Sequence, residues 1–256
     1  MFGRLFKRNL AMLLVTTIAG IVLSFAAVIS ISLTTSIYYP IEMWLHAQDL
    51  FTLLYPLLCT IPFCWEICSE RKNGFLKYVP NRAPLGRYLL YRYLGALIAI
   101  SAMIFLSSFL SAVFAEKIIS PAYPTLYGSI IGSKLWGDIL VQAPLVYAFF
   151  LSLWRMVLAG LYFSFGFLLA LWSKNSFLAL TGPFIYSLLE NYIMSILGMP
   201  SYSIATSFFI ARMAPGATKP SDLLVGPAVL AIICIITLVF NVLKSNKGNK
   251  KCLDIV

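Results

Sequence analysis

The stretch from Ala11 to Ser36 reads AMLLVTTIAGIVLSFAAVISISLTTS and contains no charged residue. A helix needs about 20 apolar residues to cross a hydrocarbon core of about 30 Å. The hydrophobic region of a cleaved signal peptide is shorter, at about 7–15 residues. We therefore interpret the stretch as a transmembrane helix that stays in the protein.

The composition of the whole chain agrees with this interpretation. The chain has 256 residues, 61% of them hydrophobic and 11% charged, and its mean hydropathy is +0.90. Soluble domains carry about 25% charged residues, and a soluble core of this size could not bury so much apolar surface. The sequence therefore predicts an all-α integral membrane protein. It excludes a soluble enzyme and a stand-alone nucleic-acid-binding protein, despite the net charge of +10.

Hydropathy along the chain predicts six transmembrane helices within one domain, 1–256. The expected spans are about 11–36, 50–67, 93–114, 149–172, 177–197 and 223–243. Residues 1–10 alternate apolar and basic side chains at helical spacing, which indicates an interfacial helix on the cytoplasmic surface; an unstructured basic segment is the alternative. Residues 244–256 form a basic cytoplasmic tail.

Two regions leave alternatives open. Ile139 to Trp172 is too long for one straight span, because a helix rises about 1.5 Å per residue. It forms either two short spans that meet near Arg155 or one span after a break at Pro144, and we expect the single span because no turn residues surround Arg155. The outer segment Met199 to Asp222 contains SIATSFFIARMA, which is apolar enough to dip back into the membrane.

The basic residues predict the orientation in the membrane. With six spans, one side carries Arg4, Lys7, Arg8, Arg71, Lys72, Lys77, Arg82, Arg87, Arg92, Lys174, Lys244, Lys247, Lys250 and Lys251. The other side carries Lys117, Lys134, Arg212 and Lys219. Because cytoplasmic loops are enriched in Lys and Arg, both termini are expected in the cytoplasm. The positive charge is therefore a topology signal, and it needs no nucleic acid partner to explain it.

The most charged segment is the cytoplasmic connection from Ser69 to Arg92. Its centre, GFLKYVP from Gly74 to Pro80, places apolar side chains where the chain must face the cytosol. Apolar residues ringed by charge are typical of a protein-docking surface. The alternative is a short helix that packs under the membrane surface.

This connection resembles the intracellular loop of ABC-2-type transporter permeases. The similar residues are Glu70-Arg71-Lys72-Asn73-Gly74-Phe75-Leu76-Lys77, then Pro80-Asn81-Arg82, then Arg87-Tyr88-Leu89 and Arg92. The resemblance implies a half-transporter in the bacterial cytoplasmic membrane that pairs with a second permease chain, the same or homologous, across spans one and five. It also implies a coupling helix that docks on a separate ABC ATPase, present in two copies. That helix comprises Gly74, Phe75, Leu76, Lys77, Tyr78 and Val79.

The sequence has no G-x-x-x-x-G-K-[ST] motif, the loop that cradles nucleotide phosphates. We therefore expect no cofactor and no catalytic site on this chain, with ATP and Mg²⁺ bound by the partner ATPase. The outer half of span one is rich in Ser and Thr and the spans hold many Phe and Leu, which suits an amphiphilic substrate. Likeness to peptide-export and bacteriocin-immunity permeases favours a peptide.

Ionisable residues in and near the spans are functional candidates, because charge is costly at membrane depth. Glu66 and Glu70 lie one helical turn apart at the inner end of span two, where they can pair with Arg71, Arg87 or Arg92 and hold the loop. Arg155 and Glu190 are expected to face the protein interior, where they pair or line an outer translocation cavity. The alternative for both is snorkelling to the outer headgroups.

Other functions have weaker support. Cys64 and Cys68 have the spacing of metal ligands on one helix face, but their neighbours are apolar and His46 is the only histidine, so we expect no metal site. An intramembrane protease would need histidines or paired aspartates within the spans. A membrane sensor or regulatory subunit of an ABC system, and a passive channel or scramblase, remain as alternatives.

Overall fold

The computed structural model describes residues 2–75, 85–124, 133–173, 175–213 and 219–247, and within them all regular elements are helices. The long helices are α1 (Phe2–Thr34), α2 (Pro40–Lys72), α4 (Leu85–Lys117), α6 (Pro144–Trp172), α7 (Ser176–Ile196) and α9 (Val225–Lys247). The short ones are α5 (Gly137–Gln142), η3 (Pro200–Tyr202), α8 (Ile204–Phe208), η4 (Ile210–Arg212) and η5 (Asp222–Leu224).

Five helical stretches are long and apolar enough to cross a membrane. They are Leu14–Thr34, Pro40–Lys72, Gly86–Lys117, Pro144–Trp172 and Asp222–Val239. This agrees with the predicted all-helical membrane protein. α7 has 21 residues and matches the expected span 177–197, but it contains Pro183 and Glu190 and is not one of the five.

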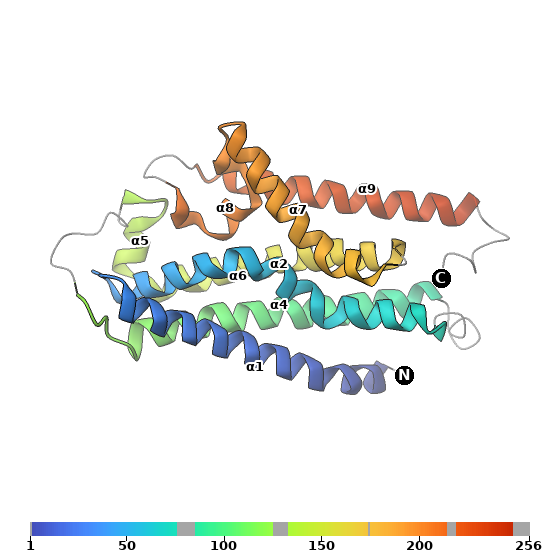
Figure 1. The fold of residues 1–256 in the computed structure, drawn as a ribbon, viewed down its shortest axis with the longest axis horizontal. Coiled ribbons are helices and arrows are strands. Elements are labelled where there is room, and N and C mark those ends of the chain that lie inside the picture. The colour runs from blue at the N-terminus through green and yellow to red at the C-terminus, as the bar shows by residue number, and fades with distance from the viewer. Residues whose placement is uncertain (1, 76–84, 125–132, 174, 214–218, 248–256) are drawn as a thin grey trace.

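The long helices form a bundle in which consecutive members run in opposite directions (Figure 1). α1 packs on α2 and α4 at one edge, whereas α6 lies centrally and contacts α2, α4, α7 and α9. The N-terminal end of α1 and the C-terminal end of α9 lie at the same end of the bundle (Figure 1). The α2–α4 and α6–α7 connections begin at this end too, which we call the inner end. The opposite, outer end carries α5.

Two expected boundaries are wrong. Residues 1–10 do not form an element of their own, because α1 is one continuous helix from Phe2 to Thr34. Residues 41–49, expected as an outer connection, are the first turns of α2, which Pro40 opens at its N1 position. Ile41, Trp44 and Leu45 are buried there, and so are the polar residues Glu42 and Gln48, so packing inside the protein keeps the segment helical.

The long apolar region before Trp172 is a single helix, as expected, and α5 ends just before the predicted break at Pro144. α6 begins five residues earlier than the expected span 149–172, which places Arg155 near the helix middle. α2 contains Pro56 and Pro62 and changes direction near its centre (Figure 1). A proline removes one helical hydrogen bond, which explains the bend.

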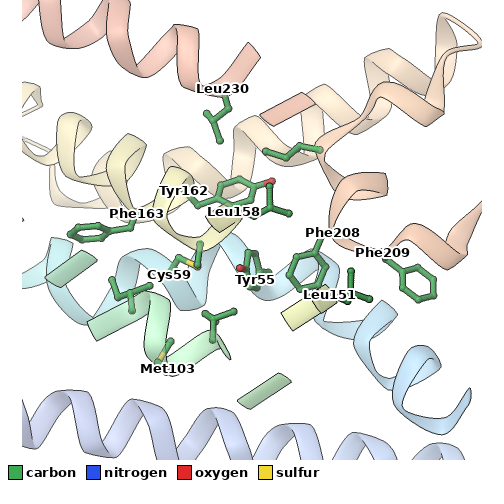
Figure 2. Close-up of a cluster of buried hydrophobic side chains, with 14 of the residues drawn as sticks. Tyr55, Cys59, Met103, Leu151, Leu158, Tyr162, Phe163, Phe208, Phe209 and Leu230 are labelled. Carbon is green, nitrogen blue, oxygen red and sulfur yellow. The ribbon is translucent and has the colours of Figure 1, made fainter. Parts of the chain in front are cut away.

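The core lies where α2, α6 and α8 meet. Figure 2 shows Tyr55 between Tyr162 and Phe208, and the ring centroids of Tyr55 and Phe208 are 4.0 Å apart. α2 and α6 approach closely because Gly166 has no side chain: a Cβ there would lie 2.6 Å from Thr60 Cγ2. Tertiary packing therefore fixes α2 against α6 at this level of the bundle.

The part of the apolar outer segment from Ser203 to Ile210 is buried inside the protein. All five residues of α8 are buried, and α8 contacts α2, α6, α7 and α9. Gly226, at the start of α9, lies directly against this segment: a Cβ there would approach Ile204 N to 2.5 Å and Tyr202 O to 2.8 Å. The close approach lets α9 cover α8.

Gly226→Ala is therefore expected to destabilise the protein by about 1–3 kcal/mol, the usual cost of forced overpacking. Gly95→Ala is the matched control, since a Cβ at this helical glycine meets nothing within 4 Å. Thermal unfolding can be followed with a thiol-reactive fluorophore in a Cys252→Ser background, because Cys59, Cys64, Cys68 and Cys234 are free and buried. An equal unfolding midpoint for both alanine variants would contradict the expectation.

Candidate functional site

An ion cluster joins α2 to α4 at the inner end. Arg92 Nη2 lies 2.7 Å from Glu66 Oε2 and 3.2 Å from Glu70 Oε1, and the Arg92 side chain is only 4% exposed. Tyr88, one turn before Arg92, donates its hydroxyl to Glu70 Oε2 at 3.1 Å. Three of the predicted charges, Glu66, Glu70 and Arg92, therefore come together.

The other two predicted charges behave differently. Arg71 Nη1 donates to Ala170 O at 3.1 Å and to Ser173 O at 2.6 Å, at the C-terminal end of α6. A cation there satisfies free carbonyls and complements the helix dipole. Arg87 is exposed, and among the described residues it makes no ion pair. The inner end of α2 is thus tied to α4 through Arg92 and to α6 through Arg71.

The predicted coupling helix is described only at its start. Gly74 ends α2 with φ +71°, a left-handed conformation that favours glycine, and its N–H donates to Arg71 O. Phe75 is 41% exposed, and its ring centroid lies 6.4 Å from that of Tyr88. Leu76, Lys77, Tyr78 and Val79 lie outside the described residues.

Arg155 is fully buried near the middle of α6, with 0% exposure. Its Nε donates to Phe208 O at 3.2 Å, and its Nη1 donates to Ser108 Oγ at 2.9 Å. Arg155 Cζ lies 4.9 Å from the ring centroid of Trp44 and 4.8 Å from that of Phe208, as in cation–π contacts. The snorkelling alternative is wrong for this residue, because its charge is enclosed by protein.

Ser108 is the hub of this polar site. Its hydroxyl accepts hydrogen bonds from Arg155 and from Ser152 Oγ at 3.0 Å, and its carbonyl accepts one from Trp44 Nε1 at 2.9 Å. The hydroxyl of Tyr55 donates to the Arg155 carbonyl oxygen. Sequence reasoning missed Trp44, Tyr55 and Ser108, whose only signal is a polar atom on an otherwise apolar stretch.

A cavity of ≈ 110 Å³ adjoins Arg155 between α1, α2 and α4. Its polar lining consists of Thr16, Ser24, Gln48, Tyr55, Ser107, Ser108 and Arg155. Its apolar lining includes Leu23, Phe51, Leu58, Ile61, Met103, Ile104 and Phe208. The predicted association of Arg155 with a cavity therefore has a structural counterpart, located beside α1.

Glu190 does not pair with Arg155. Its Oε2 accepts from Ser203 Oγ at 2.8 Å and its Oε1 accepts from Ile204 N at 3.1 Å, so the carboxylate caps the start of α8. The Glu190 side chain is buried, which argues against snorkelling. It also does not line the ≈ 110 Å³ cavity. Its visible role is to hold α8 in place.

A second cavity of ≈ 380 Å³ lies near α5. It is lined by Trp136, Ile139, Tyr147, Phe150, Leu151, Trp154, Ile210, Pro220, Leu223 and Leu224. Lys134 donates to the carbonyls of Ala211 and Met213 and so ties the residues before α5 to the end of η4. Partial burial lowers the pKa of the Lys134 ammonium. The outer end thus offers an apolar, aromatic-lined space.

Metal-ligating groups are dispersed in the part of the chain that the structure describes. No group of three or more His, Cys, Asp or Glu side chains comes together there. Cys64 and Cys68 are free and buried on α2.

Comparison with protein-family models, with curated proteins and with solved structures finds no match for this chain. The functional argument therefore depends on the geometry described above.

Proposed function

We propose that this chain is the transmembrane permease subunit of an ATP-binding-cassette exporter that moves an amphiphilic substrate, a peptide in the favoured case, out of a bacterial cell. A separate ABC ATPase, present in two copies, would bind ATP and Mg²⁺ and drive it. A second permease chain would complete the translocation path. The proposal rests on the loop resemblance and on the way the structure mounts that loop.

The observation that carries the proposal is the base of the loop. Arg92 of α4 pairs with both Glu66 and Glu70 of α2, so the helix ends on either side of the loop are held together. Arg71 extends this attachment to the end of α6. A force on the loop would therefore move three helices together, which is what an ATP-driven permease requires.

The bundle also fits the expected topology. With α7 as a sixth crossing, the long helices alternate in direction, and the N-terminal end of α1 and the C-terminal end of α9 both lie at the inner end (Figure 1). Arg71, Lys72, Arg87 and Arg92 lie near this end. The positive-inside rule then assigns the inner end, with both termini, to the cytoplasm.

The ATPase-docking prediction can be tested by co-purification. We would co-express the chain with the ATPase encoded nearest its gene, purify through a tag on this chain, and measure ATP hydrolysis in lipid. The variant with Phe75, Leu76 and Tyr78 all changed to serine is expected to lose the ATPase, because docking surfaces depend on a few buried apolar residues. Wild-type protein is expected to retain it.

Phe177→Ser is the matched control, since Phe177 is an exposed aromatic residue at the start of α7, near the same end of the bundle. It is expected to co-purify the ATPase as wild type does. Equal co-purification by the triple variant would contradict docking through this loop. If wild type retains no ATPase in a wider pull-down, the channel and scramblase alternatives become the leading proposals. Co-purification without substrate export would favour the sensor subunit.

A further inference from the structure

Arg155 is a buried cation that has no counter-charge among the residues the structure describes. Among the described residues no ion pair involves it, and its Nη2 has no hydrogen-bond partner. Two neutral oxygens and two aromatic rings surround the remainder of the guanidinium. Removing a charge from water is costly unless it is paired and hydrogen-bonded. The site is therefore energetically incomplete as the protein alone presents it.

The adjoining cavity can hold the missing group. Its ≈ 110 Å³ is several times the about 10–15 Å³ that one water molecule needs. Ser108 and Gln48 line it beside Arg155 and can donate additional hydrogen bonds, whereas the Tyr55 hydroxyl already donates to the Arg155 carbonyl. An anionic group in this cavity would lie beside the guanidinium and neutralise its charge, because carboxylates and phosphates match arginine geometry.

The cavity also reaches the apolar surface of the protein. Leu23 of α1 and Ile61 of α2 line it, yet they are 50% and 44% exposed. In a membrane protein, exposed apolar side chains on such helices face lipid. The side between α1 and α2 is therefore the direction from which a lipid-like molecule reaches Arg155.

We propose that this cavity binds the anionic headgroup of an acidic amphiphile, a carboxylate or phosphate monoester, whose apolar tail extends between α1 and α2 into the bilayer. The inference deepens the proposed function and rests on it in one respect: only if the chain is an exporter subunit is the bound acidic amphiphile the exported substrate. The binding step itself requires only this chain in a membrane.

The test uses the full chain in phosphatidylcholine nanodiscs without any ATPase, and measures saturable binding of radiolabelled palmitate. Dodecyl phosphate is expected to displace palmitate. Methyl palmitate is expected to be at least about tenfold weaker, since it lacks the charge and one charge-assisted contact is worth that much or more. Acetate and inorganic phosphate are expected to be weaker by at least the same factor, because they lack the apolar tail and each buried CH₂ is worth about 0.8 kcal/mol. If inorganic phosphate displaced palmitate as potently as dodecyl phosphate does, the cavity would be a site for free anions. That result would overturn the proposal that its ligand is an amphiphile.

A substitution of Arg155 itself could prevent folding, so the test uses two glycine variants instead. Gly20 lines the cavity, and a Cβ there has its nearest contact at 3.8 Å, so Gly20→Leu starts a side chain at the cavity wall without a clash at Cβ. It is expected to weaken palmitate binding at least about tenfold, whereas Gly95→Leu, on α4 away from the cavity, leaves binding unchanged. Equal binding in both variants, or no saturable binding by wild type, would overturn the site. Either result leaves the ATPase co-purification test unaffected.

Discussion

Arg92→Met is expected to destabilise the protein more than any other single change at the inner end, by about 3–5 kcal/mol, because it leaves two carboxylates without their shared cation. Glu70 is buried and the side chain of Glu66 is only 20% exposed, so water replaces little of the lost interaction. Methionine has a similar length and apolar stem, which limits the loss of packing. The loss is measured as a lower unfolding midpoint by thiol labelling in the Cys252→Ser background.

Arg87→Met is the matched control for this prediction. It removes an arginine from the same helix, but the Arg87 side chain is exposed and makes no ion pair among the described residues. Its expected effect is below about 0.5 kcal/mol, as for ordinary surface substitutions. Similar midpoints for the two variants would show that the ion cluster does not stabilise α2 against α4.

The beginning of α2 shows why hydropathy alone misplaced a boundary. Glu42, His46 and Asp49 interrupt the apolar run, so a membrane span could not start before them. The structure nevertheless starts the helix at Pro40 and buries Trp44 and Gln48 on one face. Pro40 at the first helical position was an available signal. The burial of this segment against α4 could not be predicted, because it depends on contacts between residues far apart in the sequence.

Arg155 shows the same limit at the candidate site. Its charge within an apolar stretch identified it as functional, and the single helix around it was predicted correctly. The burial of Arg155 and the identity of its partners were not predicted, since Ser108, Phe208 and Trp44 come from three other segments. A serine among apolar residues does not indicate in the sequence which guanidinium its hydroxyl will accept a hydrogen bond from. Only tertiary structure brings them together.

α2 connects the ion cluster at the inner end to the Arg155 site, the two candidate functional regions. Its inner end carries Glu66, Glu70 and Arg71 beneath the loop, and its outer half carries Trp44 and Tyr55 at the Arg155 site. Pro56 and Pro62 lie between these groups and weaken the helix there. We therefore expect α2 to be the element that links movement of the loop to the shape of the cavity.

Glu190→Leu is expected to release α8 from the rest of the protein. The carboxylate accepts from Ser203 Oγ and Ile204 N, and both residues are 0% exposed. Ser203 Oγ also lies 3.3 Å from Asn191 Oδ1, so the leucine variant leaves the buried Ile204 N–H without its acceptor. Each unsatisfied buried donor costs about 1–3 kcal/mol. Since α8 also presents the carbonyl of Phe208 to Arg155, its release would open the Arg155 site from the side opposite α1.

Trypsin cleavage after Arg212 reports this release directly, because Arg212 is exposed but held within η4 beside α8. Cleavage tracks the open population when opening is fast, so Glu190→Leu is expected to accelerate it at least about tenfold. Glu190→Gln keeps one carbonyl acceptor and is expected to fall between wild type and the leucine variant. Cleavage after Lys117, which is exposed at the C-terminal end of α4 and is followed by Ile118, serves as the internal reference. Equal cleavage after Arg212 in wild type and Glu190→Leu would mean that packing by Gly226 and the start of α9, rather than the Glu190 cap, keeps α8 in place.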